Sequence, residues 1–379
     1  PDQGPVPAPG PVTDPGRMPR SGRVCHELGS REELMAALRT LVVGTLRDGA
    51  GLPLPATTAT GHPVPADPSD DGPAAVPDPQ VIADRRDGLV VRFGGLVVKV
   101  HDPSTDPLLL AARLRLAALP GARDVLVPPV PVAAAALAEF TARTGRVASV
   151  WPAGVPLSAE ELDEAPWEQG AVLLARLHAV PLPRGAVGGS AGHGPPHPPV
   201  GAPARVRRSI ERLRGSAPCR PETALVTEAY ETLPRWAVGE APAPDGGRPA
   251  LTHGDWHLGQ LLRLGGRWRL IDVDDLGVGD PVWDLARPAA WFAVGVLGPD
   301  VWRRFLHSYV SAGGTALPSG ADPWARLDVP ARAMTVQTAA VAVAHATELD
   351  EPLDDVALAF LDGCRRITRD NGRSGSGER

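Results

Sequence analysis

The order of β-rich and helical segments along this chain limits the folds that it can adopt. The runs VIA, LVVRF and LVVKVH follow one another within residues 81–101. Two turn signals, Asp87-Gly88 and Gly94-Gly95, separate them, and such dipeptides between β-rich runs are typical of hairpins. The segment therefore predicts a three-stranded antiparallel meander.

Most later segments have helical periodicity. Further strands are predicted at 130–140, 146–154, 259–264 and 267–273, and helices at 106–119, 165–180, 204–215, 221–237 and across 281–369. Because strands lead and helices follow, the pattern favours an α+β fold. We expect two lobes: a small antiparallel β-sheet lobe, and after it a larger, mainly helical lobe.

The residues before this meander have a different composition. Residues 1–24 are rich in Pro and Gly, which is typical of disorder. Residues 29–46 have helical periodicity, and Ser30 and Glu33 have the spacing of a capping box. The predicted organisation is a disordered tail at 1–24, a helix and linker at 25–80, a β-sheet lobe and hinge at 81–153, a helical lobe at 154–369 and a flexible tail at 370–379.

Composition and charge exclude several classes of protein. The net charge of −6 gives no electrostatic reason to bind nucleic acid. No run of about 18 apolar residues is present to span a membrane, and residues 1–20 lack the apolar core of a secretory signal. Cys25, Cys219 and Cys364 are scattered and in no metal-ligand spacing, which predicts a cytoplasmic protein without disulfides. The sequence does not indicate an oligomeric state.

Lysine is almost absent from this chain. Of 38 basic residues Lys99 is the single lysine, which leaves 38 − 1 = 37 arginines. The composition suggests a coding bias that replaces lysine by arginine wherever either serves. Lys99 lies near the end of the third predicted strand, and either it has a function that arginine cannot perform or it is an exposed residue retained by chance.

The strongest chemical signal is the segment LTHGDWHLGQLLRLGGRWRLIDVDD, residues 251–275. It places Asp255, Gln260 and Asp272 around a short strand–turn–strand unit. Such a set suits phosphoryl transfer, because one carboxylate can accept or orient a hydroxyl while an amide oxygen and a second carboxylate hold Mg²⁺.

The motifs HGDWHLGQ and IDVDDLGVGDPVWDLA resemble the aminoglycoside phosphotransferase and choline kinase family, which is related to the protein kinases. The HLGQ form is also similar to bacterial maltokinases, and the resemblance spans roughly residues 81–365. It implies a protein-kinase-like two-lobe fold that uses ATP and Mg²⁺. The residue roles that it implies are Asp255 as the catalytic aspartate, Gln260 and Asp272 as metal ligands, Lys99 on the phosphates, and the backbone of Val150, Trp151 and Ala153 near adenine.

Two positions depart from the family pattern. The metal-binding amide is Gln260 in place of the more usual asparagine, and its carbonyl lies one methylene further out. The family also has a glutamate on the helix after the lysine strand, whereas residues 107–119 contain no carboxylate. Either Asp102, Asp106 or Glu139 replaces that glutamate, or Lys99 has no partner until ATP binds.

Other polar residues of the motifs have two interpretations. The alternation of His253, Asp255 and His257 is also compatible with a metal-dependent hydrolase. We favour structural hydrogen bonds in the catalytic turn for His253, and for His257 a position that supports a metal ligand rather than one that binds the metal. Asp274 and Asp275 are compatible with acids at the surface. For Asp274 the alternative is a position next to Asp272, through which it would act on the metal. Asp284 resembles the family aspartate that braces the catalytic loop.

Candidate acceptor-binding residues come from the helical lobe. Trp283 and Trp291 are aromatic candidates, and Glu351, Asp354 and Asp355 belong to an acidic run that begins at Glu348. The run either forms a negative wall for a cationic acceptor or, as we favour, a solvated loop whose acids stabilise a helix N-terminus.

The sequence thus predicts transfer of the γ-phosphate of ATP to a hydroxyl of a small molecule, such as an aminoglycoside, a sugar or an amino alcohol. One alternative is a kinase of serine or threonine in a peptide during natural-product maturation. Another is a nucleotide-binding pseudokinase that serves as a regulatory module.

Overall fold

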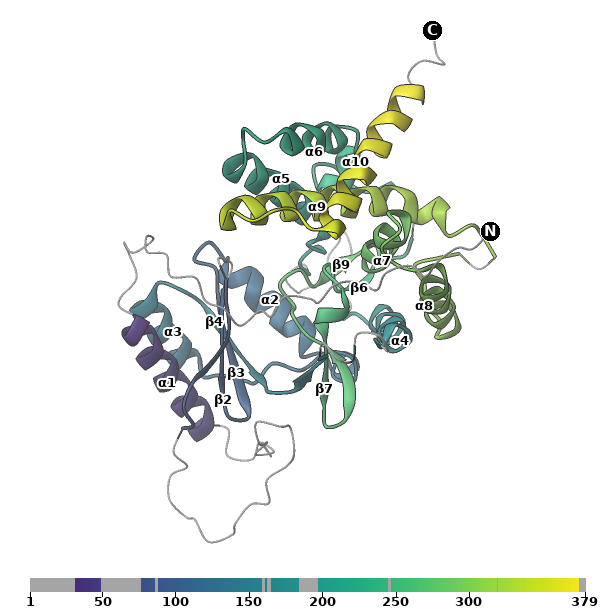
Figure 1. The fold of residues 1–379 in the computed structure, drawn as a ribbon. Helices are drawn as coiled ribbons and strands as arrows, with labels where there is room; N and C mark the ends of the chain where they lie inside the picture. The colour runs from purple at the N-terminus through teal and green to yellow at the C-terminus, as the bar shows by residue number, and fades with distance from the viewer. Residues whose placement is uncertain are drawn as a thin grey trace, which may run out of the picture.

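The computed structural model describes residues 31–48, 76–85, 88–158, 161, 165–183, 197–244, 247–318 and 320–374. Figure 1 shows a β-sheet with flanking helices in the N-terminal half and a mainly helical C-terminal half. The predicted α+β class, with strands first and helices after, is confirmed.

The N-terminal sheet is antiparallel and has the order β1-β2-β3-β4. Its strands are β1 (Gln80–Arg85), β2 (Gly88–Phe93), β3 (Leu96–His101) and β4 (Ala148–Pro152). The predicted meander is therefore confirmed, with β4 added at its edge. Gly94 has a φ of 57° in the β2–β3 turn, a conformation that glycine adopts at no steric cost.

Two helices cover one face of this sheet, and a third lies on its other side (Figure 1). The covering helices are α1 (Arg31–Asp48) and α3 (Ala134–Thr144), whose Leu38 and Phe140 join a core with Val98 of β3. Helix α2 (Pro107–Ala117) lies between the sheet and the C-terminal lobe. The predicted helix at 29–46 is confirmed as α1, although Ser30 of its capping box lies outside the described residues.

The predicted strand at 130–140 is wrong, because most of this stretch belongs to α3. The run AAAALAEF has four consecutive alanines, and alanine is the strongest helix former. A short apolar run cannot be assigned to helix or strand by periodicity alone. The strand predicted next to it, within 146–154, is confirmed as β4.

The C-terminal lobe is built from helices and two small sheets. One sheet has the order β5-β7-β8 and the other pairs β6 with β9. The strands are β5 (Val155–Pro156), β6 (Ala250–Thr252), β7 (Leu261–Leu264), β8 (Arg267–Leu270) and β9 (Gly277–Gly279). The helices are α4 (Trp167–His178), α5 (Ala202–Ser216), α6 (Pro221–Glu231), α7 (Trp283–Ala293), α8 (Pro299–Ser311), α9 (Trp324–Leu349) and α10 (Asp355–Ser374).

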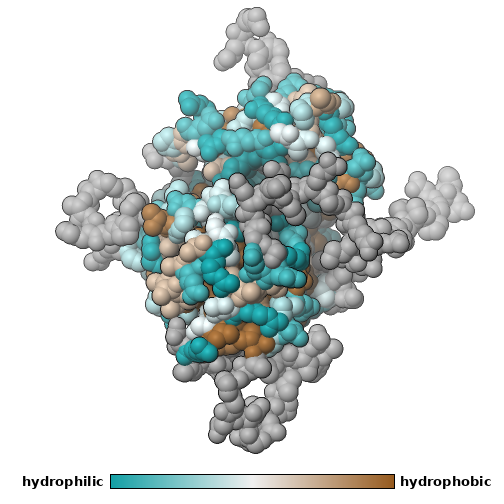
Figure 2. All heavy atoms as spheres, turned by 90° about the vertical axis from the view of Figure 1, so that its left-hand side faces the viewer, coloured by the Kyte–Doolittle hydropathy of each residue, from teal (hydrophilic) through white to brown (hydrophobic). Residues whose placement is uncertain are grey.

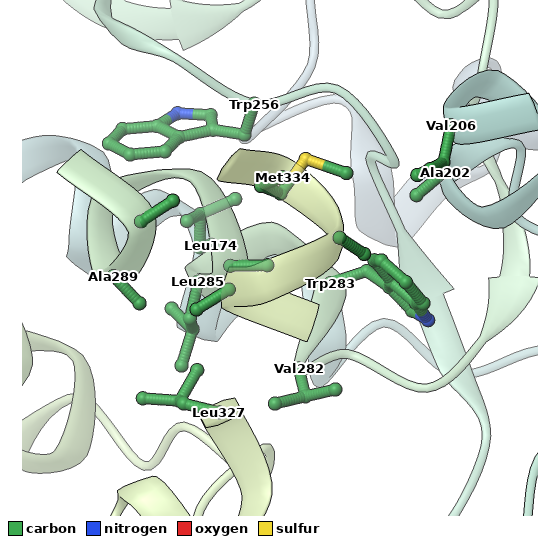
Figure 3. Packing of buried hydrophobic residues seen from close by; sticks show 14 of the residues in the cluster. Leu174, Ala202, Val206, Trp256, Val282, Trp283, Leu285, Ala289, Leu327 and Met334 are labelled. Carbon is green, nitrogen blue, oxygen red and sulfur yellow. The ribbon is translucent and has the colours of Figure 1, made fainter. Parts of the chain in front are cut away.

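A second core, separate from that of the N-terminal lobe, fills the C-terminal lobe. Figure 3 shows Trp283 and Leu285 of α7 packed near Met334 of α9, with Trp256 from the segment between β6 and β7. Trp256 is 1% exposed and stacks on Phe305 of α8. This packing holds the strand–turn–strand unit with its polar residues against rigid helices. Among the described residues, no helix is long and apolar enough to cross a membrane.

Candidate active site

The turn after β6 carries Asp255 and is held from two sides. The Asp284 carboxylate, on α7, accepts hydrogen bonds from the backbone N–H groups of His253 at 2.8 Å and Gly254 at 2.7 Å. The Nε2 atom of His253 donates to the carbonyl of Ile271 at 2.8 Å. Gly254 has a φ of 84°, and a Cβ there would lie 2.5 Å from the carbonyl oxygen of Asp275, so this turn needs glycine.

Asp255 projects from this turn into a pair of guanidinium groups. Its Oδ2 lies 2.6 Å from Arg205 of α5, and its Oδ1 accepts a hydrogen bond from Arg287 of α7. Burial raises the pKa of Asp255 above its ordinary value, although Arg205 and Arg287 act to lower it. A buried carboxylate with a raised pKa is suited to receive a proton.

Arg205 also contacts a second carboxylate. Its Nη1 lies 2.6 Å from Oδ2 of Asp275, and Arg208 lies 3.1 Å from Oδ1 of the same residue. The surface position considered for Asp275 is therefore wrong, because this residue is 3% exposed. Sequence reasoning missed Arg205, Arg208 and Arg287, since nothing distinguished them from the other arginines.

Lys99 of β3 reaches across to the C-terminal lobe. Its Nζ lies 2.8 Å from Oδ1 of Asp272 and 2.8 Å from Oδ2 of Asp274. Burial would lower the pKa of Lys99, but the two carboxylates outweigh it and raise the pKa above its ordinary value. Lys99 is thus a paired cation that joins the two lobes.

The expectations for the partner of Lys99 are corrected by these contacts. Lys99 is not unpaired, and the residues that bond it are Asp272 and Asp274. Of the three residues expected to substitute for the missing glutamate, Asp102 accepts hydrogen bonds from Ser104, Asp106 caps α2, and Glu139 lies 4.0 Å from Arg143.

Asp274 is also linked to the sheet by a histidine. His101 of β3 is 2% exposed, and its Nδ1 lies 3.5 Å from Oδ1 of Asp274. Its Nε2 lies 2.8 Å from the hydroxyl of Ser149 on β4. Burial acts to raise the pKa of Asp274, but the His101 hydrogen bond and the charge of Lys99 lower it strongly. Sequence reasoning did not single out His101.

Asp272 has an unusual backbone conformation. Its φ of 64° lies in the left-handed region, which is rare for residues other than glycine and is often found at functional sites. Burial acts to raise its pKa, but Lys99 lowers it below the ordinary value. The backbone of Gln260 lies next to this segment, because its main-chain carbonyl accepts a hydrogen bond from the N–H of Ile271 at 2.9 Å.

The donor chemistry of this corner fits Mg²⁺. A carboxylate at Asp272 and an amide oxygen at Gln260 are hard oxygen ligands, and Mg²⁺ takes few of them from protein when phosphates supply the rest. The described residues contain no cluster of three or more His, Cys, Asp or Glu side chains that could hold a metal by themselves. A site completed by nucleotide phosphates agrees with both observations.

The two histidines of the motif bond to the surrounding chain. His257 accepts a hydrogen bond from the N–H of Gly259 at 3.1 Å, and its other ring nitrogen lies 3.2 Å from the Gln260 amide nitrogen. Burial, with the neighbouring Arg287, lowers the pKa of His257 to about 3, so its ring is neutral at pH 7. These contacts favour positioning roles over a hydrolase metal site.

The backbone expected near adenine already has partners. The N–H of Ala153 donates to the carbonyl of Gly95 at 2.8 Å, and the carbonyl of Val150 accepts from Val130 at 2.8 Å. The Trp151 indole donates to Ser149 at 2.9 Å. An adenine placed here would have to compete with the Ala153 hydrogen bond.

Of the aromatic candidates for the acceptor site, Trp283 lies in the core and Trp291 is partly buried against it. Trp283 is 4% exposed and sits among buried residues in Figure 3, so it packs within the lobe rather than facing a ligand. Trp291 packs edge-to-face on Phe360 of α10.

The acidic run lies between α9 and α10. Glu348 pairs with Arg212 of α5 at 2.6 Å, and Asp354 accepts a hydrogen bond from the N–H of Ala357 at 2.7 Å. Asp355 is in the first turn of α10, and Glu351 is exposed. Asp354 and Asp355 thus lie at the N-terminus of α10, where acids are favourable, whereas Glu348 belongs to the last turn of α9.

The chain has an antiparallel sheet that carries Lys99, and next to it a helical lobe in which Asp284 braces the His-Gly-Asp turn. This arrangement is that of a kinase-like phosphotransferase fold. The phosphotransferase enzyme family matches residues 78–325. The chain belongs to this family, and the family predicted from its motifs is thereby confirmed. None of the curated proteins compared with the chain matches it.

Solved structures agree on the fold. An amicoumacin kinase in complex with AMP-PNP, Ca²⁺ and Ami superposes with a TM-score of 0.53 and 13% identity over 77% of this chain and 88% of that one. A thermostable mutant of an aminoglycoside phosphotransferase superposes with a TM-score of 0.50 and 14% identity, over 78% of this chain and 96% of that one. Choline kinase from Cryptosporidium parvum superposes with a TM-score of 0.50 and 10% identity, over 79% of this chain and 90% of that one. At such identities the likeness shows the fold alone.

Proposed function

We propose that this phosphotransferase moves the γ-phosphate of ATP, with Mg²⁺, to a hydroxyl group of a small molecule. The observation that carries the proposal is the contact between Lys99 of the sheet and Asp272 of the C-terminal lobe, 2.8 Å apart. It brings a candidate phosphate-binding cation to a candidate metal ligand across the two lobes. The complex of the amicoumacin kinase with AMP-PNP supports ATP as the donor.

Each residue of the site has a role in this proposal. Asp272 and Gln260 would hold Mg²⁺, which neutralises phosphate charge when bound. Lys99 would then bond the nucleotide phosphates. Asp255 would orient the acceptor hydroxyl and receive its proton as the oxygen attacks the γ-phosphorus, while the bond to ADP breaks.

The charges around Asp255 bear on the acceptor. Arg205 and Arg287 contact this carboxylate, and Arg208 lies one helical turn from Arg205 on α5. Like charges that face each other are unfavourable. In the acidic run, Glu348 is neutralised by Arg212, and Asp354 is used to bond the N–H of Ala357 at the start of α10. A neutral acceptor such as a sugar is therefore favoured over a polycationic aminoglycoside.

The two alternatives from the sequence have less support. A pseudokinase was suggested by the missing helix glutamate, but Lys99 has two carboxylate partners without it. A peptide kinase would need a docking surface, and no contact among the described residues indicates one.

An ADP-release screen tests the proposal. Aminoglycosides, maltose and related sugars, amino alcohols and hydroxylated peptides would each be incubated with the protein, ATP and Mg²⁺. The proposal predicts ADP release above background with a small molecule and a phosphomonoester signal in ³¹P NMR. Turnover with peptides alone would favour the peptide kinase. Nucleotide binding without turnover in any class would favour the pseudokinase.

A further inference from the structure

Helix α2 carries an arginine whose guanidinium has an unsatisfied donor. Arg113 is half-buried, and its Nε atom is buried without a hydrogen-bond partner. Within the part of the chain that the structure describes, no ion pair or hydrogen bond of Arg113 is observed. A buried donor without a partner costs stability, so a ligand that completes its hydrogen bonds would be favoured.

The acids near Arg113 already have other cations. Asp275 and Asp274 attract Arg113 most strongly, followed by Asp272. Asp275 is bonded by Arg205 and Arg208, and Asp274 and Asp272 by Lys99. Burial, the largest effect, lowers the pKa of Arg113 despite these acids.

The other cations near these acids each contact a carboxylate. Lys99 contacts Asp272 and Asp274. On the other side, Arg205 contacts Asp255 and Asp275, Arg208 contacts Asp275, and Arg287 contacts Asp255. Of these five described cations, Arg113 is the one for which no carboxylate contact is observed.

The position of α2 places this cation next to the nucleotide side. The helix follows β3, the strand of Lys99, after a short connection. Figure 1 shows α2 between the four-stranded sheet and the C-terminal lobe. The helix carries no carboxylate within 107–117, and its Arg113 lies close enough to Asp275 and Asp274 to be attracted by their charges.

We propose that Arg113 binds the phosphates of the nucleotide together with Lys99, so that α2 contributes a cation to the site in place of a carboxylate. The inference rests on the proposed function. Guanidinium presents a planar fork of donors that matches phosphate oxygens. If Asp272 holds Mg²⁺, Lys99 would keep Asp274 as its carboxylate partner, and Lys99 and Arg113 would be the cations available to the triphosphate.

Nucleotide affinity measured by calorimetry tests this role. The variant is Arg113→Gln, and the matched control is Arg115→Gln on the same helix, at an exposed position. The ligands are AMP-PNP with Mg²⁺, and adenosine alone. We expect Arg113→Gln to bind AMP-PNP about 10- to 100-fold more weakly, the range for a charge-assisted hydrogen bond, with adenosine affinity unchanged. The control should bind both ligands like the wild type.

Two further measurements exclude a purely structural role. The melting temperature of Arg113→Gln without nucleotide should equal or exceed that of the wild type, because an unsatisfied buried donor is removed. Arg113→Glu should bind AMP-PNP more weakly than Arg113→Gln. If Arg113→Glu instead binds more tightly than Arg113→Gln, the helix needs a carboxylate partner for Lys99 and our inference is wrong.

The outcomes separate this inference from the proposed function. If the wild type binds AMP-PNP and Arg113→Gln binds it equally well, the role of Arg113 is overturned and the proposed function is left intact. A lower melting temperature with weaker adenosine binding shows a structural role and also overturns it. No binding of AMP-PNP by the wild type overturns both.

Discussion

Two groups of ion pairs flank the site, and they use different cations. The nucleotide-side group consists of Lys99, Asp272 and Asp274, and the base-side group consists of Asp255, Asp275, Arg205 and Arg287. In the first, one compact ammonium is shared by two carboxylates and joins the lobes. In the second, the guanidinium of Arg205 contacts two carboxylates of the same lobe, Asp255 and Asp275. Under the proposed function, the cation that would exchange carboxylates for phosphates is a compact ammonium, whereas the cations that hold Asp255 are planar guanidinium groups.

The two groups also shift carboxylate pKa values in opposite directions. Burial acts to raise the pKa in each case, but Lys99 lowers the pKa of Asp272 and of Asp274. At Asp255 burial outweighs Arg205 and Arg287, and the pKa is raised. Asp272, the proposed metal ligand, and its neighbour Asp274 are therefore kept ionised, whereas Asp255, the proposed proton acceptor, has a pKa raised by burial.

The largest effect is expected at the base-side carboxylate. Asp255→Asn should lower kcat by about 10²- to 10⁴-fold, the usual loss when a proton acceptor is removed. Binding of AMP-PNP with Mg²⁺ should change little, because the nucleotide-side group is untouched. The control is Asp300→Asn, an exposed residue of α8. Turnover at the wild-type rate would show that Asp255 is not the catalytic carboxylate.

On the nucleotide side, Asp272→Ala should remove the Mg²⁺ dependence of nucleotide binding. We expect AMP-PNP affinity in Mg²⁺ to fall by about 100-fold or more, because losing even a group that orients a metal ligand costs 10- to 100-fold. Asp274→Ala should have a smaller effect, since Asp274 would act through Lys99 and Asp272. If Asp272→Ala binds Mg²⁺ and AMP-PNP like the wild type, the metal site lies elsewhere.

The pH dependence of activity should reveal the arginine contacts of Asp255. Asp255 must be ionised to receive a proton, so kcat/KM should fall as the pH drops through its pKa. Arg205→Gln removes a cation that lowers this pKa, and the acid limb should therefore move to higher pH. Arg205→Lys should restore part of the shift, and the surface variant Arg332→Gln should not move it. If the acid limb of Arg205→Gln stays at the same pH as in the wild type, Arg205 does not affect the pKa of the catalytic carboxylate.

The smallest effect is expected at the amide. Gln260→Asn keeps a carbonyl oxygen and the same donor set, so activity should fall by only a few-fold, whereas Gln260→Leu should lose the metal contact. Activity titrated against Mg²⁺ concentration measures both. Equal Mg²⁺ dependence in Gln260→Leu and the wild type would remove Gln260 from the metal site.

The sequence predicted those parts of the fold that depend on local signals. The turn at Gly94-Gly95 and the β-branched runs around it determine the meander, and both are visible in the sequence. The stretch at 130–140 differs from the prediction because a short apolar run fits a strand as well as a helix by periodicity, whereas its four alanines favour the helix α3. The predicted helix at 221–237 ends earlier, at Glu231, and a separate 3₁₀ turn follows Pro234.

The residues of the site also fall into two classes, those that a local sequence motif reveals and those that only the tertiary fold brings together. Asp255, Gln260 and Asp272 lie within one motif, so their proximity could be inferred from the sequence. Arg205, Arg287 and His101 come from α5, α7 and β3, and only the tertiary fold brings them to the carboxylates. Among 37 arginines no local signal marks the few that enter the site, whereas the single lysine could be found at once.

The distinction between the two groups depends most on Lys99. If Lys99 must leave Asp272 for the nucleotide phosphates, a wider guanidinium would displace the phosphates from Asp255, and a misplacement of about 1 Å can cost 10²-fold in rate. The matched control is Arg92→Lys on the neighbouring strand β2, paired with Val97 of β3.

The direct test is kcat and the KM for ATP of Lys99→Arg beside Arg92→Lys and the wild type. The account predicts a kcat for Lys99→Arg lower by about 100-fold, with a folded protein and wild-type values for Arg92→Lys. Wild-type kcat and KM in Lys99→Arg would contradict it, and would show that the lone lysine is an interchangeable charge.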